Sequence, residues 1–329
     1  MRQVIMLLVL TAAIAAVSCK NLSTLPVTKA VRSNETLIPV PPGYREIFRS
    51  DFSGTTLTKD GSGSQWWHKM TGGEFGYNWA GCPELSGSPD RGPRVQTLVA
   101  ATSDLDNYMK AAIIDERGPQ GKILKFTNLL DDPNAPDLSR NQVLTQLDKK
   151  INKLFYEFKY KLPKATADSL KARNGKWWDI TEFHNNTGPD GHIYRLSFYI
   201  QADGKHQLST GKTGSGYYFR ARLYDDTSRS TIWADDKPIE EIWGPDALDK
   251  AWDVWHTISV HVEAAGSGPE DGLIKAWVDG HSFCNRIGNP LGWPWSNLHI
   301  FKAYVSSNTM TSVPLDFFVD DIRIYRGND

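Results

Sequence analysis

The sequence predicts an all-β protein, a two-sheet antiparallel β-sandwich of the jelly-roll type. Seven segments are rich in aromatic and β-branched residues, and clusters of Gly, Asp and other turn residues bound them. Many strands joined by long, glycine-rich connections are typical of such sandwiches. Only two short helices are expected, at residues 103–109 and 246–251. The expected strands are residues 155–161, 193–201, 217–224, 256–263, 273–278, 298–305 and 317–325.

Composition narrows the classes of partner but does not decide the function. The chain has 329 residues, enough for one large all-β domain or two ordinary ones. Its formal net charge is −1, so the overall charge does not indicate nucleic acid as a partner. The 12 Trp, 12 Tyr and 13 Phe residues fit a large aromatic core, and they also fit a surface that stacks on sugar rings. Composition leaves both interpretations open.

Residues 1–18 have the pattern of a secretory signal peptide. A short basic start precedes an apolar run over residues 4–17. This run is too short for a membrane-spanning helix, which needs about 20 apolar residues. Small residues lead up to Cys19, as in the bacterial signal after which a cysteine is lipidated. We therefore expect a cell-envelope lipoprotein anchored at Cys19, with plain secretion as the alternative.

Residues 19–45 are expected to be a tether, because they are polar and contain four prolines. No internal repeat and no second linker follows, so we expect residues 46–327 to form one domain that acts as a monomer. Cys82 and Cys284 are able to pair in an oxidising compartment, but the sequence does not show that they are close. Three cysteines without a CxxC motif or neighbouring histidines predict no zinc site.

Three of the expected strands have one apolar face and one face that combines Tyr with Arg or Lys. Side chains two residues apart point to the same side of a strand. One side of strand 193–201 carries Leu196, Phe198 and Ile200, which form a core face. The opposite sides of the three strands carry, in order, Arg195, Ser197, Tyr199 and Gln201; Tyr218, Arg220, Arg222 and Tyr224; and Ile300, Lys302, Tyr304 and Ser306.

These polar faces predict a binding surface for an acidic polysaccharide. A solvated sheet face would mix Lys, Glu and Thr, whereas here the cations are mainly Arg, interleaved with Tyr and nearly without carboxylates. Guanidinium groups match carboxylate or sulfate groups, and tyrosine rings stack on sugars. If the three strands lie in one sheet, they form a cationic, aromatic, concave face. A plain solvated sheet face is the alternative.

The segment WWDITEFHNN, residues 177–186, extends this surface. In a regular strand Glu182 and His184 share one side with Trp178 and Ile180, while Phe183 points to the other side. We expect this strand to join the same face. Taken alone, His184 is better explained as a buried, hydrogen-bonded imidazole, and Glu182 as the partner of an arginine. Together with Arg195, Arg220 and Tyr304, the two residues favour a site.

Several segments resemble the jelly-roll polysaccharide lyases, a concanavalin-like or lectin-like group that includes heparin lyase I, glucuronan lyases and, more distantly, alginate lyases. The sequence Glu182-Phe-His184 is similar to a Gln-x-His or Glu-x-His strand of these enzymes, and Phe301-Lys-Ala-Tyr304 is similar to their late strand. Residues 155–159, 255–261, 271–280 and 317–325 resemble a strand before the site, the back-sheet hairpin and the closing strand. The likeness covers residues 46–325.

The resemblance implies β-elimination at a 4-linked uronate, which requires a cation that neutralises the carboxylate, a base and an acid. It implies an arginine of the polar face as the cation, His184 or a neighbouring tyrosine as the base, and Tyr304 as the acid. Lys302 is expected to bind substrate or to act on that tyrosine. The expected catalytic set is His184, Tyr304, Lys302 and Arg195, and the expected substrate-binding set is Glu182, Tyr199, Gln201, Tyr218, Arg220, Arg222, Tyr224 and Trp178.

The resemblance implies that no metal or other cofactor is required for the reaction. Similar sandwiches hold a structural calcium ion between their first and last strands. Asp51, Asp320 and Asp321 are the expected ligands of such an ion in this chain.

Two other functions stay open at this stage. One is a surface lipoprotein that binds glycans without cleaving them. The other is a glycoside hydrolase on the same fold, which needs two carboxylates about 5–10 Å apart. Glu182 is one candidate for that pair, and no Glu-x-Asp-x-x-Glu strand supplies the other.

The lipid anchor is tested at the mature N-terminus. We expect mass spectrometry to find a chain that begins at a lipid-modified Cys19, because the signal is removed just before that residue. Cys19→Ser should release the protein from the membrane fraction. A mature N-terminal peptide that holds an unmodified Cys19 inside a longer chain would contradict the prediction.

Overall fold

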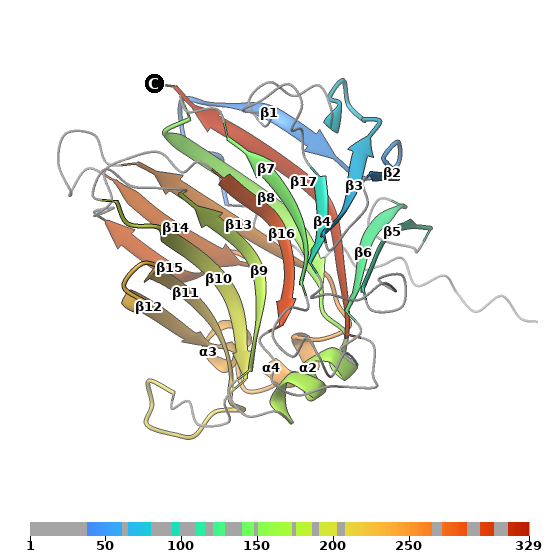
Figure 1. Cartoon of the computed structure of the whole chain (residues 1–329). Coiled ribbons are helices and arrows are strands. Elements are labelled where there is room, and N and C mark those ends of the chain that lie inside the picture. Colours follow the sequence, from blue (N-terminus) through green and yellow to red (C-terminus); the bar gives the residue numbers. More distant parts are fainter. Residues whose placement is uncertain are drawn as a thin grey trace, which may run out of the picture. The chain divides into compact units, whose positions relative to one another are not determined.

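The computed structural model describes residues 38–60, 65–79, 94–98, 109–115, 121–128, 140–147, 151–172, 176–185, 191–202, 208–264, 272–287, 297–305 and 315–328. Strands dominate this part of the chain, and three short helices accompany them (Figure 1). The all-β prediction is therefore confirmed. The signal peptide, Cys19, Cys82 and most of the tether lie outside the described residues.

One antiparallel sheet contains eight of the described strands. Its order is β15-β14-β13-β8-β17-β6-β5, and β1 also pairs with β17. The members are β1 (Tyr44–Ser50), β5 (Met109–Ile114), β6 (Ile123–Asn128), β8 (Lys153–Lys161), β13 (His256–Glu263), β14 (Leu273–Val278), β15 (His281–Ile287) and β17 (Leu315–Gly327).

The other antiparallel sheet contains nine described strands in the order β12-β11-β10-β9-β16-β7-β4-β3-β2. The three strands with a polar face, and the strand that contains WWDITEFH, are neighbours in this sheet as β11, β10, β9 and β16 (Figure 1). The members are β2 (Thr56–Asp60), β3 (Gln65–Thr71), β4 (Arg94–Leu98), β7 (Arg140–Gln146), β9 (Lys176–His184), β10 (Tyr194–Ala202), β11 (Tyr217–Asp225), β12 (Ser230–Pro238) and β16 (Asn297–Val305).

The long closing strand β17 joins the two ends of the chain. One of its edges pairs with β8, and the other is shared by β6, which pairs with residues 315–319, and by β1, which pairs with residues 322–327. The change of partner occurs at Asp320 and Asp321, where the register shifts and Asp321 has a φ of 44°. The first and last described strands therefore pair with each other, as the resemblance to similar sandwiches implied.

The core lies between the two sheets and follows the predicted alternation. Leu196, Phe198 and Ile200 on β10 are buried in it, as are the alternate residues of β11 that face the same way. Contacts cross from sheet to sheet: the Tyr156 hydroxyl of β8 lies 2.6 Å from Thr181 Oγ1 of β9. Burial of apolar area on this scale is the main stabilising contribution to a sandwich of this kind.

Three helices occur among the described residues: α2 (Lys164–Lys171), α3 (Ile239–Trp243) and α4 (Ala247–Lys250). The helix expected at 246–251 is confirmed as α4, whereas residues 103–108 lie outside the described residues and Met109 begins β5. The sequence did not predict α2, whose Ala167 carbonyl accepts a hydrogen bond from the Tyr217 hydroxyl at 3.0 Å. No helix in the described ranges is long and apolar enough to cross a membrane.

A β-bulge in β9 changes which residues share a face. Thr181 pairs with Phe198 and Asp179 with Tyr199, so Ile180 is one extra residue on β9. A bulge of this kind shifts the alternation of side chains by one position. Ile180 and Thr181 both face the core.

The bulge overturns the predicted position of Trp178. This side chain is fully buried in the core, and its ring centroid lies 5.6 Å from that of Phe317 in the opposite sheet. It is therefore not on the polar face with Glu182, as regular alternation had predicted. Trp177 takes that place and lies beside Tyr199, with 5.7 Å between ring centroids.

A second register shift occurs in β16. His299 pairs with Leu144 and Phe301 with Val143, so Ile300 is the extra residue on this strand. Ile300 and Phe301 are both buried in the core, which corrects the prediction that Ile300 shares the polar face. The register instead pairs His299 with Glu182 and Tyr304 with Asp179.

The bulge in β9 predicts opposite results for its two adjacent tryptophans. Trp178→Ala should lower the free energy of unfolding by about 3–5 kcal/mol, because it leaves a cavity in the core. Trp177→Ala is the matched control and should cost much less, because Trp177 lies on the far side of the sheet. Chemical denaturation monitored by circular dichroism measures both, and equal losses would contradict this assignment of faces.

Candidate functional site

The candidate site is the outer face of the nine-stranded sheet, defined as the face turned away from the core. The strand register arranges its residues in rows that run across β9, β10 and β11. Neighbouring strands are about 4.8 Å apart and successive rows about 6.6 Å apart. The rows are His184, Arg195 and Tyr224; then Glu182, Ser197 and Arg222; then Asp179, Tyr199 and Arg220; then Trp177, Gln201 and Tyr218.

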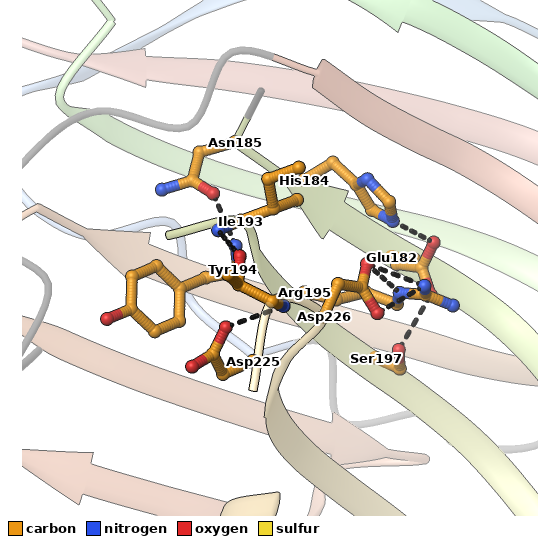
Figure 2. Close-up of polar contacts among 10 residues, drawn as sticks. Glu182, His184, Asn185, Ile193, Tyr194, Arg195, Ser197, Asp225 and Asp226 are labelled. Atoms are coloured by element: carbon orange, nitrogen blue, oxygen red, sulfur yellow. Dashed lines mark hydrogen bonds and ion pairs between the residues drawn. The ribbon is translucent and has the colours of Figure 1, made fainter. Parts of the chain in front are cut away.

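Glu182 and His184 form a close pair at one end of this face. His184 Nε2 lies 3.0 Å from Glu182 Oε1, and Figure 2 shows the imidazole turned toward the carboxylate. The Glu182 side chain is 1% exposed, whereas that of His184 is 22% exposed. The imidazole is thus the member of the pair that a bound molecule is able to reach.

The buried carboxylate of Glu182 is held by several groups. Its Oε2 accepts a hydrogen bond from Ser197 Oγ at 2.7 Å and lies 3.9 Å from Arg195 Nε. A buried carboxylate is strongly disfavoured unless charged or hydrogen-bonding partners compensate it. The alternative interpretation of Glu182 as the partner of an arginine agrees with its closeness to Arg195.

The end of β9 directly after His184 is fixed by Asn185. The Asn185 amide donates to the Tyr194 carbonyl at 3.1 Å, and Asn185 Oδ1 accepts from the Tyr194 amide at 2.6 Å (Figure 2). Asn185 itself is buried. These two bonds hold the backbone that carries the imidazole.

Arg195 is neutralised by an aspartate from the turn after β11. Its Nη2 donates to Asp226 Oδ1 and Oδ2 at 2.6 Å each, and its Nε donates to Oδ2 at 3.2 Å (Figure 2). Burial acts to lower the pKa of Arg195, but Glu182 and Asp226 together raise it above its usual value. Arg195 is therefore a fixed cation that holds two carboxylates.

Arg220 is neutralised in the same way by Asp236 of β12. Its Nε and Nη2 donate to the two carboxylate oxygens at 2.5 Å each, and its Nη1 donates to Gln201 Oε1 at 3.1 Å. The hydrogen bond with Asp236 raises the pKa of Arg220. The expectation of a face nearly without carboxylates is therefore wrong for the described residues.

Arg222 differs from the other two arginines. Its guanidinium lies over the rings of Tyr224 and Tyr199, 4.9 and 5.5 Å from their centroids. Its Nε is buried and has no hydrogen-bond partner, and no carboxylate among the described residues forms an ion pair with it. Within the described part of this face, Arg222 is the guanidinium best placed to receive an external anion.

Tyr199 of this face does not have a lowered pKa. Burial raises the pKa of Tyr199, although Arg222 and Arg220 act to lower it. Tyr199 and Tyr218 are each 1% exposed, and the Arg220 guanidinium lies 5.0 Å from the centroid of the Tyr218 ring. Tyr199 is therefore a neutral, packed ring rather than the activated base that was one sequence-based alternative.

Strand β16 brings its residues to the same sheet by register. Tyr304 pairs with Asp179, and Lys302 pairs with Gln142 of β7 on the other side. Asp179 and His184 are two rows apart along β9, or about 13 Å. Lys302 and Arg220 belong to one sheet, as predicted.

Several residues of the site were missed by sequence reasoning. The carboxylates that occupy the arginines come from a turn and from β12, which the sequence had not identified as a strand. Regular alternation places Asp179 on the core side, whereas the bulge in β9 puts it on the outer face, where it is 2% exposed. The acidic residues were visible in the sequence, but no pattern linked them to particular arginines. The missed residues are Trp177, Asp179, Ser197, Asp226, Asp236 and His299.

The calcium site expected at the ends of the first and last strands stays a prediction. Asp51, Asp320 and Asp321 are buried or nearly so, but no three His, Cys, Asp or Glu side chains among the described residues are grouped so as to hold a metal ion. Asp320 Oδ1 instead accepts a hydrogen bond from the Asp321 amide at 2.8 Å. This arrangement supports the backbone at the register shift of β17.

Of the two cysteines that are able to pair, only Cys284 lies within the described residues. Cys284 is buried, and its Sγ lies 3.7 Å from the Ile274 carbonyl oxygen. Burial raises the pKa of its thiol. Whether Cys284 pairs with Cys82 stays open, because Cys82 lies outside the described residues.

Comparisons with solved structures return polysaccharide lyases, a β-glucanase and the binding domain of a botulinum neurotoxin. An endo-β-1,4-glucuronan lyase from the fungus Trichoderma reesei is 13% identical, covers 67% of this chain and 87% of its own, and has a TM-score of 0.42. Alginate lyase vAL-1 from Chlorella virus is 15% identical with coverages of 69% and 99% and a TM-score of 0.42. A β-glucanase from Bacillus licheniformis is 15% identical with coverages of 87% and 97% and a TM-score of 0.37.

These likenesses concern the fold alone, because the identities and TM-scores are low. No protein-family model matches the chain, and no curated protein matches its sequence. The strand pairing of the chain itself shows a two-sheet antiparallel sandwich, and its chemistry has to be argued from its own side chains.

Proposed function

We propose that the protein cleaves an acidic, uronate-containing polysaccharide by β-elimination on the outer face of its nine-stranded sheet. The observation that carries this proposal is the 3.0 Å contact between the reachable imidazole of His184 and the buried carboxylate of Glu182. A carboxylate that orients an imidazole is a recurring arrangement of general bases in enzymes. A protein that only binds glycans has no need of it.

His184 is assigned the proton transfer. In β-elimination the C5–H bond of the uronate breaks, a C4–C5 double bond forms and the C4–O4 bond to the next sugar breaks. His184 takes the C5 proton, and the imidazolium beside Glu182 then returns a proton to the departing O4. Glu182 stabilises that imidazolium, and Ser197 and Arg195 hold Glu182 in place.

Arg222 is assigned the neutralisation of the substrate carboxylate, which makes the C5 proton more acidic. It stands one row and two strands from His184, so the two backbones are about 12 Å apart. Their side chains leave room for about one sugar residue between the two groups. Arg195 and Arg220 are poorer choices, because aspartates already occupy them.

Lys302 and Tyr304 are assigned to substrate binding farther along the face. The register pairs Tyr304 with Asp179, two rows from His184 and one row farther along the face than Arg222. This assignment departs from the expectation that Tyr304 supplies the acid. His299, the register partner of Glu182, is the β16 position nearest the proposed chemistry.

The cellular setting belongs to the same proposal. A signal peptide over residues 1–18 and a lipid on Cys19 would present the domain at the cell envelope, where it meets polysaccharides outside the cell. We propose that it acts there as a monomer, without nucleic acid and without a required cofactor.

The reaction is tested by following the ultraviolet absorbance of unsaturated uronate on alginate, glucuronan, heparin and chondroitin. On the cleaved polymer, His184→Ala should lower turnover by about 10²–10⁴-fold, because general acid–base groups typically supply that factor. His281→Ala is the matched control: it removes an exposed histidine of β15 in the other sheet and should leave turnover unchanged.

Tyr304→Phe separates the two assignments of proton transfer. It should mainly weaken binding, with a much smaller effect on turnover than His184→Ala. Near-wild-type turnover of His184→Ala together with a large loss in Tyr304→Phe would transfer the chemistry to Tyr304. Tight binding of these polymers without any unsaturated product would identify a glycan-binding protein instead.

A further inference from the structure

We infer that this site takes a polysaccharide whose acidic sugars are separated by uncharged sugars, and that Arg222 binds its carboxylates one at a time. The inference rests on the proposed function in that it takes the outer face as the glycan-binding site. It specifies how many of the sugars in the substrate carry a charge, which the proposed reaction does not define. A chain with a carboxylate on every residue is the substrate it excludes.

The first argument is the charge of the outer face itself. Three guanidinium groups lie there among the described side chains, and they are accompanied by the four carboxylates of Asp179, Glu182, Asp226 and Asp236. These groups of β9 to β12, together with Asp226, thus carry an excess of one negative charge, and the exposed Lys69 of β3 lies on the same face farther along the sheet. A groove for a densely charged polyanion would be expected to show the opposite sign.

The second argument is that two of the three arginines already bind carboxylates of the protein. Arg195 and Arg220 each place two nitrogens on a carboxylate, and their side chains are only 24% and 23% exposed. A substrate carboxylate that approached either guanidinium would meet Asp226 or Asp236 at the same time. Like charges at such short range disfavour each other.

The third argument is the reason that Arg222 stays open. On either side of it, the register places Ser197 of β10 and Ala234 of β12. Neither residue has a charge, and Ser197 Oγ is engaged with Glu182. Arg220, two residues away on the same strand, has Asp236 at the position that Ala234 holds beside Arg222. One position on β12 therefore decides which arginine is free for an anion.

Rings rather than free cations flank Arg222. Its guanidinium lies between the rings of Tyr199 and Tyr224, and Trp177 adjoins Tyr199 in the rows beyond. Aromatic and amide side chains suit sugars that carry hydroxyl or acetamido groups. The face therefore has one anion position with neutral positions next to it.

The test compares two polymers that differ only in charge density. One is a β-1,4-glucan in which about half of the residues are oxidised to glucuronate, and the other is the same glucan oxidised on every residue. Calorimetry on the mature protein measures binding, and ultraviolet absorbance measures unsaturated product. We expect tighter binding of the half-oxidised polymer, although it carries fewer charges. Equal or tighter binding of the fully oxidised polymer, or no binding of either, would overturn the inference.

Two substitutions give opposite changes. Arg222→Gln should weaken binding of the half-oxidised polymer by about ten- to hundredfold, the usual contribution of a charged hydrogen bond. Asp236→Asn frees Arg220 without changing side-chain size and should tighten binding of the fully oxidised polymer several-fold. Arg45→Gln is the control, because Arg45 is an exposed residue of β1 in the other sheet. An Asp236→Asn variant that folds normally but shows no gain on the fully oxidised polymer would overturn the inference.

The two readouts keep the inference apart from the proposed function. The binding preference decides the charge density of the ligand, whether or not the polymer is cleaved. Unsaturated product decides whether the protein is a lyase. Preference for the half-oxidised polymer without product would uphold the inference and refute the reaction. Unsaturated product from a protein that binds the fully oxidised polymer at least as tightly would refute the inference and uphold the reaction.

Discussion

The extra residue in β9 is the constraint on which the site depends. A strand alternates its side chains between two faces, so one inserted residue exchanges the faces of everything beyond it. With Ile180 and Thr181 both turned to the core, Trp178 packs inside and Asp179 joins the outer face. Glu182 and His184 then continue on that same face.

Burial of the Glu182 carboxylate couples separate parts of the chain. The charge is held by Ser197 and Arg195 of β10. Arg195 is fixed in turn by Asp226 of the turn after β11. Because an uncompensated buried charge is costly, each of these groups constrains the next. The imidazole of His184 is thus presented by a rigid support rather than by a flexible loop.

The charge of the outer face is set by the ion pairs that its arginines form, not by the sequences of β10 and β11 alone. Viewed strand by strand, β10 and β11 offer arginine and tyrosine. In the sheet, Asp236 of β12 and Asp226 of the turn neutralise two of the three arginines. The remaining arginine, Arg222, lies between tyrosine rings with small neighbours on both sides. The sequence predicted a face that is cationic along its whole length, whereas the described part of the face has one arginine placed to bind an anion.

The sequence by itself determined the sandwich, the core faces of β10 and β11, and the outer face that holds Arg195, Arg220 and Arg222, because these depend on local alternation within regular strands. It did not determine the bulges in β9 and β16, since an inserted residue is identified only from the partner strand. It also did not determine the partners of the arginines: Asp226 is 31 residues from Arg195, and Asp236 is 16 residues from Arg220. Only the tertiary structure brings such distant charges together, because strand pairing and not sequence spacing sets their distance.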